Sequence, residues 1–171
     1  MKLNLGCGNR VFGEEGWINV DLFDAGPPGV AYVKADISKK LPFEDDSAEE
    51  VFSCHVIEHF WPWDVNEILR DWIRVLKPAG MLVIECPNLR GAAALLIEAE
   101  KIGHGDMWRA AMNAFYGDPK DTRIEDRHKW GYTQRTLIGL LKKLGLSDVH
   151  QEPAQYKMRE PRDMRVVGIK G

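Results

Sequence analysis

The sequence predicts an α/β fold in which helices cover both faces of one β-sheet, giving a three-layer sandwich. Strand-like apolar runs alternate with segments of helical periodicity along the chain, and no repeat or low-complexity linker interrupts them. The length of 171 residues is near the usual size of a single core, and the 44% hydrophobic content is enough to fill one. We therefore expect a single domain over residues 1–171.

Seven strands are expected from the apolar runs. The connections at 9–16 and 23–29 hold residues for only a turn or two, whereas a crossover between parallel strands normally takes a dozen or more. The first two crossover helices should therefore be vestigial. The expected strands lie near residues 2–6, 17–22, 30–35, 49–54, 81–86, 146–152 and 164–169.

Two amphipathic helices should flank the sheet. Over residues 64–76, Asp64 can cap the first turn and Glu67, three residues later, can complete a capping box. The apolar side chains of this segment share one face. The same pattern predicts a helix over 133–144 that ends at Gly145.

A large insertion follows the fifth expected strand, at about residues 89–129. Segments 89–102 and 106–115 each have helical composition, and a polar loop then runs to Lys129. In open α/β sheets, ligands bind outside the carboxyl ends of the strands, where this insertion emerges. We expect it to act as a substrate lid. Additional helical packing is the alternative, because lid and core helices share the same apolar pattern.

The most informative motif is Gly6-Cys7-Gly8, at the end of the first expected strand. Closely spaced glycines let the backbone approach a ligand without an intervening Cβ. The second expected strand ends in Asp21, and an acid in this place can accept hydrogen bonds from both hydroxyls of a ribose. Together these features predict a nucleoside-binding edge.

The order and spacing of further segments resemble class I S-adenosylmethionine-dependent methyltransferases, especially small type 11-like members from bacteria and phages. The resemblance implies a Rossmann-like sheet of seven strands, mostly parallel, with an antiparallel last strand. Asn4 replaces the acid that is usual in the first motif. The segments that carry the resemblance are Leu3–Gly8, Trp17–Asp21, Asp36-Ile37, Leu41–Ser47, His55–Phe60, Leu76–Ile84 and His128–Thr133.

The resemblance also assigns a cofactor, S-adenosylmethionine, and the residues that would bind it. Its methyl group would pass to an oxygen or nitrogen of a small-molecule or sugar acceptor by in-line displacement, leaving S-adenosylhomocysteine, without a covalent enzyme nucleophile. The implied cofactor residues are Gly6, Cys7 and Gly8 at the methionine part, Asp21 and Leu22 at the ribose, Asp36 and Ile37 at the adenine, and Cys54 and His55 on the far side.

A histidine is the candidate general base for this reaction. Methylation of a neutral hydroxyl or amine releases a proton, which a side chain with an ordinary pKa of about 6.5 can accept near neutral pH. His128 lies in the loop leading out of the insertion and could face the acceptor, or could only anchor that loop. His55 and His59, after the fourth expected strand, are the other candidates.

We predict no metal site. The segment His55-x-x-Glu58-His59 matches the pattern of inverted zinc peptidases, but it follows a short strand within an ordered series of methyltransferase-like motifs. The three cysteines all fall at expected strand ends, where small buried residues are more common than ligands.

Charge and composition narrow the possible partners. The net charge of -3, and the mixture of acidic and basic residues over 120–135, argue against a nucleic-acid surface. No apolar stretch reaches the roughly 20 residues needed to span a bilayer. Three unpaired cysteines, and a Met1 that enters the first strand directly, predict a cytoplasmic protein. We expect a monomer or a homodimer that acts on a small molecule.

Two other functions use the same fold. A nicotinamide-dependent oxidoreductase has a similar ribose acid, but Val11 replaces the third glycine of its fingerprint, and Gly8 lies closer to Asp21 than that fingerprint requires. The other is a non-catalytic S-adenosylmethionine-binding subunit that needs a partner. The resembled family commonly carries an N-terminal helical extension over the cofactor, and this sequence begins at its first strand. We therefore expect a cofactor cleft that is open or closed by a partner.

Overall fold

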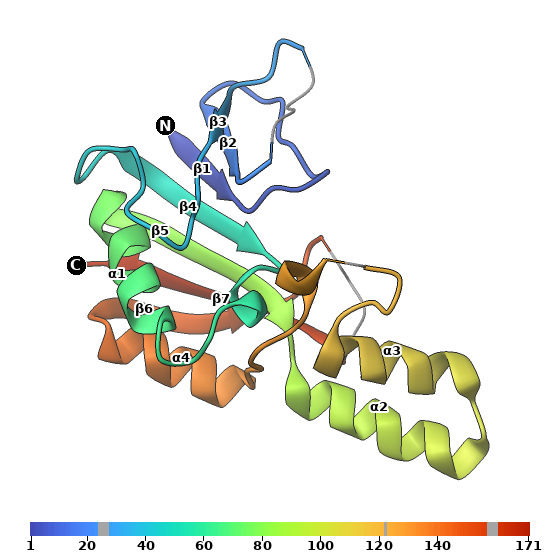
Figure 1. The fold of residues 1–171 in the computed structure, drawn as a ribbon. Coiled ribbons are helices and arrows are strands. Elements are labelled where there is room, and N and C mark those ends of the chain that lie inside the picture. The colour runs from blue at the N-terminus through green and yellow to red at the C-terminus, as the bar shows by residue number, and fades with distance from the viewer. Residues whose placement is uncertain (24–27, 122, 157–160) are drawn as a thin grey trace.

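A seven-stranded β-sheet forms the centre of the protein (Figure 1). The structure, a computed structural model, describes residues 1–23, 28–121, 123–156 and 161–171. The strands are β1 (Lys2–Leu5), β2 (Trp17–Asp21), β3 (Tyr32–Lys34), β4 (Ala48–Cys54), β5 (Leu76–Pro87), β6 (Leu146–Glu152) and β7 (Asp163–Lys170). The helices are α1 (Val65–Val75), α2 (Leu89–Ile102), α3 (Gly105–Tyr116) and α4 (Gln134–Lys143), with short 3-10 helices η1 (Ile57–His59) and η2 (Ile124–Asp126).

The strand order is β3-β2-β1-β4-β5-β7-β6, and all pairings are parallel except those of β7 with β5 and β6. The predicted mostly parallel sheet with an antiparallel last strand is thereby confirmed. The strand order reverses next to β1, which pairs with β2 on one side and β4 on the other. The carboxyl ends of the strands at such a switch point are where open α/β sheets bind ligands.

Helices α1 and α4 both pack on one face of the sheet, in front of it in Figure 1. Their apolar sides, including Trp72 of α1 and Leu137 of α4, share one core with Leu3 and Leu82 of the strands. Successive strand residues point to opposite faces. The other face carries a smaller core of Phe52, Val83 and Val167, packed against Phe12 and Trp17.

The structure confirms the vestigial first crossover, since residues 9–16 form turns and irregular backbone, without a helix. Their Phe12 side chain supplies part of the cover for the second face of the sheet, with ring centroids 4.6 Å from Trp17 and 5.4 Å from Phe52. Of the second predicted crossover, 23–29, residues 24–27 lie outside the described part of the chain.

The predicted capping box at the start of α1 is wrong. The Asp64 side chain accepts no capping hydrogen bond, and its backbone is already helical. The reason is a preceding turn, in which the N–H groups of Asp64 and Val65 donate to the carbonyl oxygen of Trp61 at 3.0 and 3.2 Å. The α4 cap is formed as expected, with the Thr133 hydroxyl accepting a hydrogen bond from the Thr136 N–H.

Strand β5 begins earlier than predicted, at Leu76 instead of near residue 81. Leu76 pairs with Ala48 in β4, so the chain passes from α1 directly into the sheet. An irregularity in the pairing between Ala48 and Glu50 then accommodates the turn-forming residues that follow Leu76.

The two insertion helices, α2 and α3, form a hairpin that projects from the carboxyl edge of the sheet (Figure 1). Gly103, with a φ of 67°, ends α2 in the left-handed conformation, and the His104 ring caps α3 by accepting the Met107 N–H at 3.3 Å. Within the described residues, none of the helices combines the length and apolar character that crossing a bilayer requires.

We expect Gly91→Ala to destabilise the protein, because a Cβ at this position would lie 1.7 Å from the carbonyl oxygen of Pro161. Overpacking of this kind typically costs about 1–3 kcal/mol. Gly139→Ala in α4 is the matched control, since nothing lies within 4 Å of its added Cβ. In an open helical position the same change should stabilise by about 0.5–1 kcal/mol. Urea unfolding measures both, and equal stabilisation by the two changes would contradict the close contact at Gly91.

Candidate active site

The glycine motif forms a tight turn at the carboxyl end of β1. Gly6 and Gly8 have φ angles of 65° and 50°, in the left-handed region that favours glycine. A Cβ on Gly6 would lie 2.5 Å from Cγ2 of Val56, so packing also requires glycine there. A Cβ on Gly8 would meet nothing within 4 Å. The space in front of Gly8 is therefore open to a ligand.

The two predicted acids stand where β2 and β3 end. Asp21 accepts the Gly8 N–H at 2.8 Å and the Phe23 N–H at 3.3 Å, which fixes the end of β2 against the glycine turn. Asp36 accepts the N–H and hydroxyl of Ser38 at 2.9 and 2.6 Å. Both carboxylates are thus held in place by their own loops.

A cavity of about 420 Å³ lies along these strand ends, and we call it the strand-end cavity. It brings together the predicted cofactor residues other than Cys7 and Cys54. Those residues are Gly6, Gly8, Asp21, Leu22, Asp36, Ile37 and His55.

Cys7 and Cys54 instead line a second cavity of about 620 Å³, the glycine-loop cavity, which shares Gly6, Gly8 and His55 with the first. Burial, followed by the charge of Asp21, raises the pKa of the Cys7 thiol to about 11. Cys7 is therefore a neutral thiol, as expected of a small residue that packs between two glycines.

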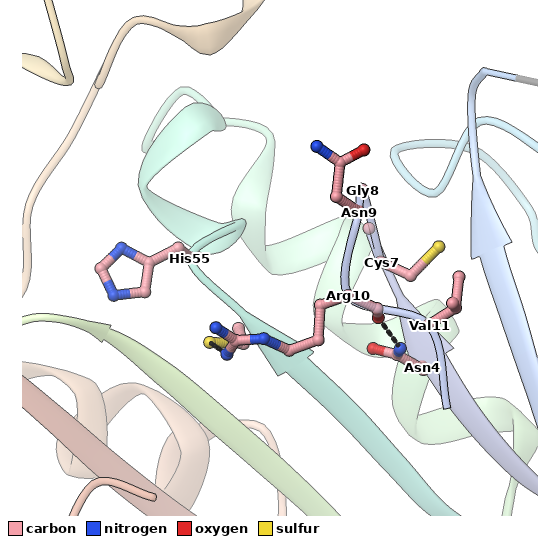
Figure 2. Close-up of a pocket in the computed structure, with 9 residues that line it drawn as sticks. Asn4, Cys7, Gly8, Asn9, Arg10, Val11 and His55 are labelled. Carbon is pink, nitrogen blue, oxygen red and sulfur yellow. Dashed lines mark hydrogen bonds between the residues drawn. The ribbon is translucent and has the colours of Figure 1, made fainter. Parts of the chain in front are cut away.

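The glycine-loop cavity also holds Arg10, which the sequence did not single out (Figure 2). Its guanidinium donates to Sγ of Cys54 at 3.1 Å and lies 5.1 Å from the ring centroid of Tyr156. The Asn4 side chain donates to the Arg10 carbonyl oxygen at 2.7 Å and to Oδ1 of Asn19 at 2.9 Å. Asn4 thus holds the glycine turn by amide hydrogen bonds in the place of the usual acid.

The insertion supplies a wall of the strand-end cavity through Arg123, Glu125, Asp126 and Lys129. The Arg123 guanidinium lies 4.4 Å from the ring centroid of Phe23 and also donates to both carboxylate oxygens of Asp126, at 2.6 and 2.9 Å. These residues fall within the insertion that was predicted to form a substrate lid, whereas the cofactor cleft was predicted to be open or closed by a partner. Their place in the cofactor cleft depends on a contact between distant segments, which the sequence does not show.

Three histidines surround a buried carboxylate next to these cavities. Glu58, 1% exposed, has Oε1 3.2 Å from Nδ1 of His55 and 3.9 Å from Nε2 of His128. The rings of His59 and His128 are 5.0 Å apart at their centroids. The carbonyl oxygen of Glu58 accepts the N–H groups of the two residues that follow His128, which brings the end of the insertion onto η1. All three predicted catalytic histidines therefore gather at one place.

Burial and neighbouring charges set the ionisation of this cluster. Burial of Glu58 favours the neutral acid, but the contact with His55 and the charges of His55, His59 and His128 outweigh it and lower the pKa of Glu58 to about 2. Burial lowers the pKa of His128 more than the Glu58 carboxylate raises it. At neutral pH, Glu58 is ionised and His128 is a neutral imidazole.

Further charged groups, which were not among the predicted site residues, support His55. Its Nε2 lies 3.5 Å from Oδ1 of Asp163, and Arg162 donates to both oxygens of that carboxylate at 3.2 Å. The His55 N–H donates to the carbonyl oxygen of Glu85 at 2.8 Å. Glu85 is itself buried and paired with Arg165 at 2.9 Å. A glutamate within the apolar run of β5 was the one available signal in the sequence.

A third cavity, of about 230 Å³, opens beside the histidines, and we call it the histidine cavity. Its other walls come largely from the end of α3 and the loop that follows it, so the insertion shapes it. The described residues that line it are His55, His59, Pro87, Asn113, Asp118, Asp121, Asp126, His128 and Arg162.

Residues 17–84 match the family model of a methyltransferase domain. The curated relative Rv3030 of Mycobacterium tuberculosis, described as a probable S-adenosylmethionine-dependent methyltransferase, is 36% identical over 61 residues, or 36% of this chain. The chain spans about a fifth of the length of that relative, 21%.

Solved structures resemble the chain over nearly its whole length. A methyltransferase described as S-adenosylmethionine-dependent, from Archaeoglobus fulgidus, has a TM-score of 0.70 at 22% identity, covering 99% of this chain and 85% of the other. The 1,6-didemethyltoxoflavin-N1-methyltransferase of Burkholderia thailandensis, solved with its substrate and S-adenosylhomocysteine, has a TM-score of 0.64 at 15% identity, covering 99% and 70%. These likenesses show that the fold is shared.

Proposed function

Because residues 17–84 match a methyltransferase domain family model and the fold is shared with S-adenosylmethionine-dependent methyltransferases, we propose that this chain is a class I enzyme of that kind, which transfers a methyl group from S-adenosylmethionine to an oxygen or nitrogen of a small-molecule or sugar acceptor. S-adenosylhomocysteine is then the second product. The observation that carries the proposal is the strand-end cavity, where an open glycine backbone faces two fixed carboxylates at the switch point of the sheet.

The residues of this cavity fit the cofactor. Gly8 leaves room for a ligand against the backbone, which a side chain would fill. Each carboxylate oxygen of Asp21 accepts one backbone N–H and keeps a second acceptor site for a ribose hydroxyl. Asp36 and Ile37 would hold the adenine, and the 6–8 turn the methionine part. When bound, S-adenosylmethionine supplies an electrophilic methyl group on its sulfonium.

We assign the acceptor to the histidine cavity, which adjoins the strand-end cavity through His55 and His59. Its lining is rich in carboxylate, amide and imidazole groups, which suits a hydroxylated acceptor such as a sugar. His128 is the proposed general base, because its neutral ring can take the proton of an acceptor hydroxyl or amine. His55 and His59 lie beside it and are the alternatives.

We propose that residues 89–129 control access to the site, and Arg123→Ala tests this. The change removes the cation–π contact with Phe23 across the strand-end cavity, worth about 0.5–1 kcal/mol. We expect the Kd for S-adenosylmethionine to rise about two- to fivefold. Arg109→Ala, which removes an exposed i,i+3 pair with Asp106 on α3, is the control and should leave the Kd unchanged. An unchanged Kd in both variants would show that the insertion does not close this cavity.

Turnover tests the proposed activity against its alternatives. The protein is incubated with S-adenosylmethionine and a panel of sugars and other small hydroxyl and amino compounds. Mass spectrometry then follows the formation of S-adenosylhomocysteine and the net gain of one CH₂ by the acceptor for each methyl group transferred. Methylation of one acceptor class supports the proposal. Cofactor binding without turnover on any acceptor would favour the non-catalytic subunit that needs a partner.

Two further proposals need their own measurements. Gel filtration tests whether the protein is a monomer or a homodimer, and cell fractionation tests its proposed cytoplasmic location.

A further inference from the structure

We propose that Glu58, His59 and His128 bind a divalent transition-metal cation. A carboxylate oxygen and two imidazole nitrogens of these residues lie within 4.8 Å of one another. The arrangement differs from the zinc-peptidase pattern weighed in the sequence, which would use His55 and His59 as ligands and Glu58 as a base. Here Glu58 is a ligand and His128, from the end of the insertion, supplies the third donor. The inference reverses our sequence prediction of no metal site.

The hydrogen bonds of the two histidines orient them as ligands. Nδ1 of His128 lies 2.9 Å from the carbonyl oxygen of Ala114, and Nδ1 of His59 lies 3.3 Å from that of Arg127. Because a carbonyl oxygen only accepts, each of these contacts needs a proton on Nδ1. In the tautomer that carries only that proton, Nε2 keeps the lone pair that a metal would use. Metal-bound histidines characteristically donate their other nitrogen in this way.

The Glu58 carboxylate gives an independent indication of a cation. It is almost fully buried, and neither oxygen accepts an aligned hydrogen bond from the residues that the structure describes. The nearest polar neighbour is Nδ1 of His55 at 3.2 Å, a contact that counts as an ion pair only when that ring is protonated. A buried carboxylate that accepts no aligned hydrogen bond is costly unless a counter-charge or a metal satisfies it. A cation between Glu58 and the two Nε2 atoms would do so.

The surroundings indicate the class of ion and its open positions. Two imidazoles and one carboxylate suit Zn²⁺, Fe²⁺ or Mn²⁺ better than Mg²⁺, which prefers oxygen ligands. Donors to one ion at about 2.0–2.2 Å lie roughly 3–4 Å apart, so shifts of about an ångström close the site. Three protein ligands leave positions toward the histidine cavity, where three aspartates outnumber the one arginine among the described lining residues.

A cation there would hold an acceptor oxygen on the side of the histidine cavity and lower the pKa of its hydroxyl. This part rests on the proposed methyl transfer. His128 would then be a ligand, and the acceptor proton would leave to another group or to solvent. Methylation that is lost on EDTA treatment and restored by Zn²⁺ or Mn²⁺ would identify the ligand role. Full activity of the metal-free enzyme would return His128 to the role of base.

Metal binding is tested without any assay of activity. Protein is treated with EDTA, dialysed and titrated calorimetrically with Zn²⁺, and we expect one equivalent to bind. Glu58→Gln and His59→Ala should each weaken binding by roughly 100-fold or more, since loss of even an outer-shell partner costs about 10–100-fold. His150→Ala removes a histidine of β6 that lies among Asp148 and Glu152, and it should leave the affinity unchanged.

Two further readouts keep this test decisive. Co²⁺ in the same site should give visible absorption bands that His59→Ala abolishes, and thermal melting establishes that each variant is folded. Absence of Zn²⁺ binding, or equal binding by wild type, His59→Ala and His150→Ala, would overturn the site. S-adenosylhomocysteine titrated into the EDTA-treated protein reports separately on the cofactor cavity. Failure of the metal site is thereby distinguished from failure of the proposed function.

Discussion

His128→Ala is expected to lower turnover by about 10²–10⁴-fold while the affinity for S-adenosylmethionine stays the same. The side chain lies in the histidine cavity, next to Glu58 and His59, and does not line the strand-end cavity. Its removal takes away the group that we propose acts on the acceptor, whether as a base or as a metal ligand. Steady-state turnover and calorimetric cofactor binding measure the two effects separately.

The control for this variant is His150→Ala, which changes an exposed histidine of β6 and should retain full activity. Because Nδ1 of His128 also anchors the loop to Ala114, the melting temperatures of both variants must be compared with that of the wild type. A folded and fully active His128→Ala enzyme would transfer the role to His55, Glu58 or His59, or show that the acceptor ionises without help.

Asp21→Ala should weaken S-adenosylmethionine binding by a few kcal/mol, since each hydrogen bond to a charged group contributes about 1.5–3 kcal/mol. The same carboxylate accepts the Gly8 and Phe23 N–H groups, so part of the loss will come from a looser glycine turn. Asp21→Asn keeps an acceptor for one of these bonds and should lose less. Equilibrium dialysis with labelled cofactor measures all of the affinities.

Asp106→Ala on the exposed start of α3 is the matched control for loss of a surface carboxylate, and it should bind the cofactor normally. If folded Asp21→Ala protein binds as tightly as the wild type, the ribose does not lie at the end of β2. The cofactor would then have to occupy the glycine-loop cavity on the other side of the turn.

The sequence predicted those parts of the fold and site that depend on residues close together in the chain. Helix α2 occupies the predicted residues 89–102, and the capped start of α4 lies at Thr133, as its periodicity indicated. The glycine turn and Asp21 were also predictable, because strand ends and backbone conformation leave characteristic residues at fixed places. The seven-stranded, mostly parallel sheet with its antiparallel last strand followed from the resemblance of whole motifs.

What the sequence could not provide are contacts between distant segments. The early start of β5 depends on the pairing of Leu76 with Ala48, and the failed cap at Asp64 depends on the turn before it. His128 reaches Glu58 only because the α2–α3 hairpin returns the chain to η1. No local pattern encodes that path. The sequence therefore presented as separate candidates three histidines that the fold gathers into one cluster around a buried carboxylate.

The central claim, that the strand-end cavity binds S-adenosylmethionine, is tested most directly by calorimetric titration of the wild-type chain with S-adenosylhomocysteine and, separately, with NADH. We predict saturable binding of one equivalent of S-adenosylhomocysteine and no detectable binding of NADH. A folded protein that binds NADH and not S-adenosylhomocysteine would contradict this account and favour the nicotinamide-dependent oxidoreductase.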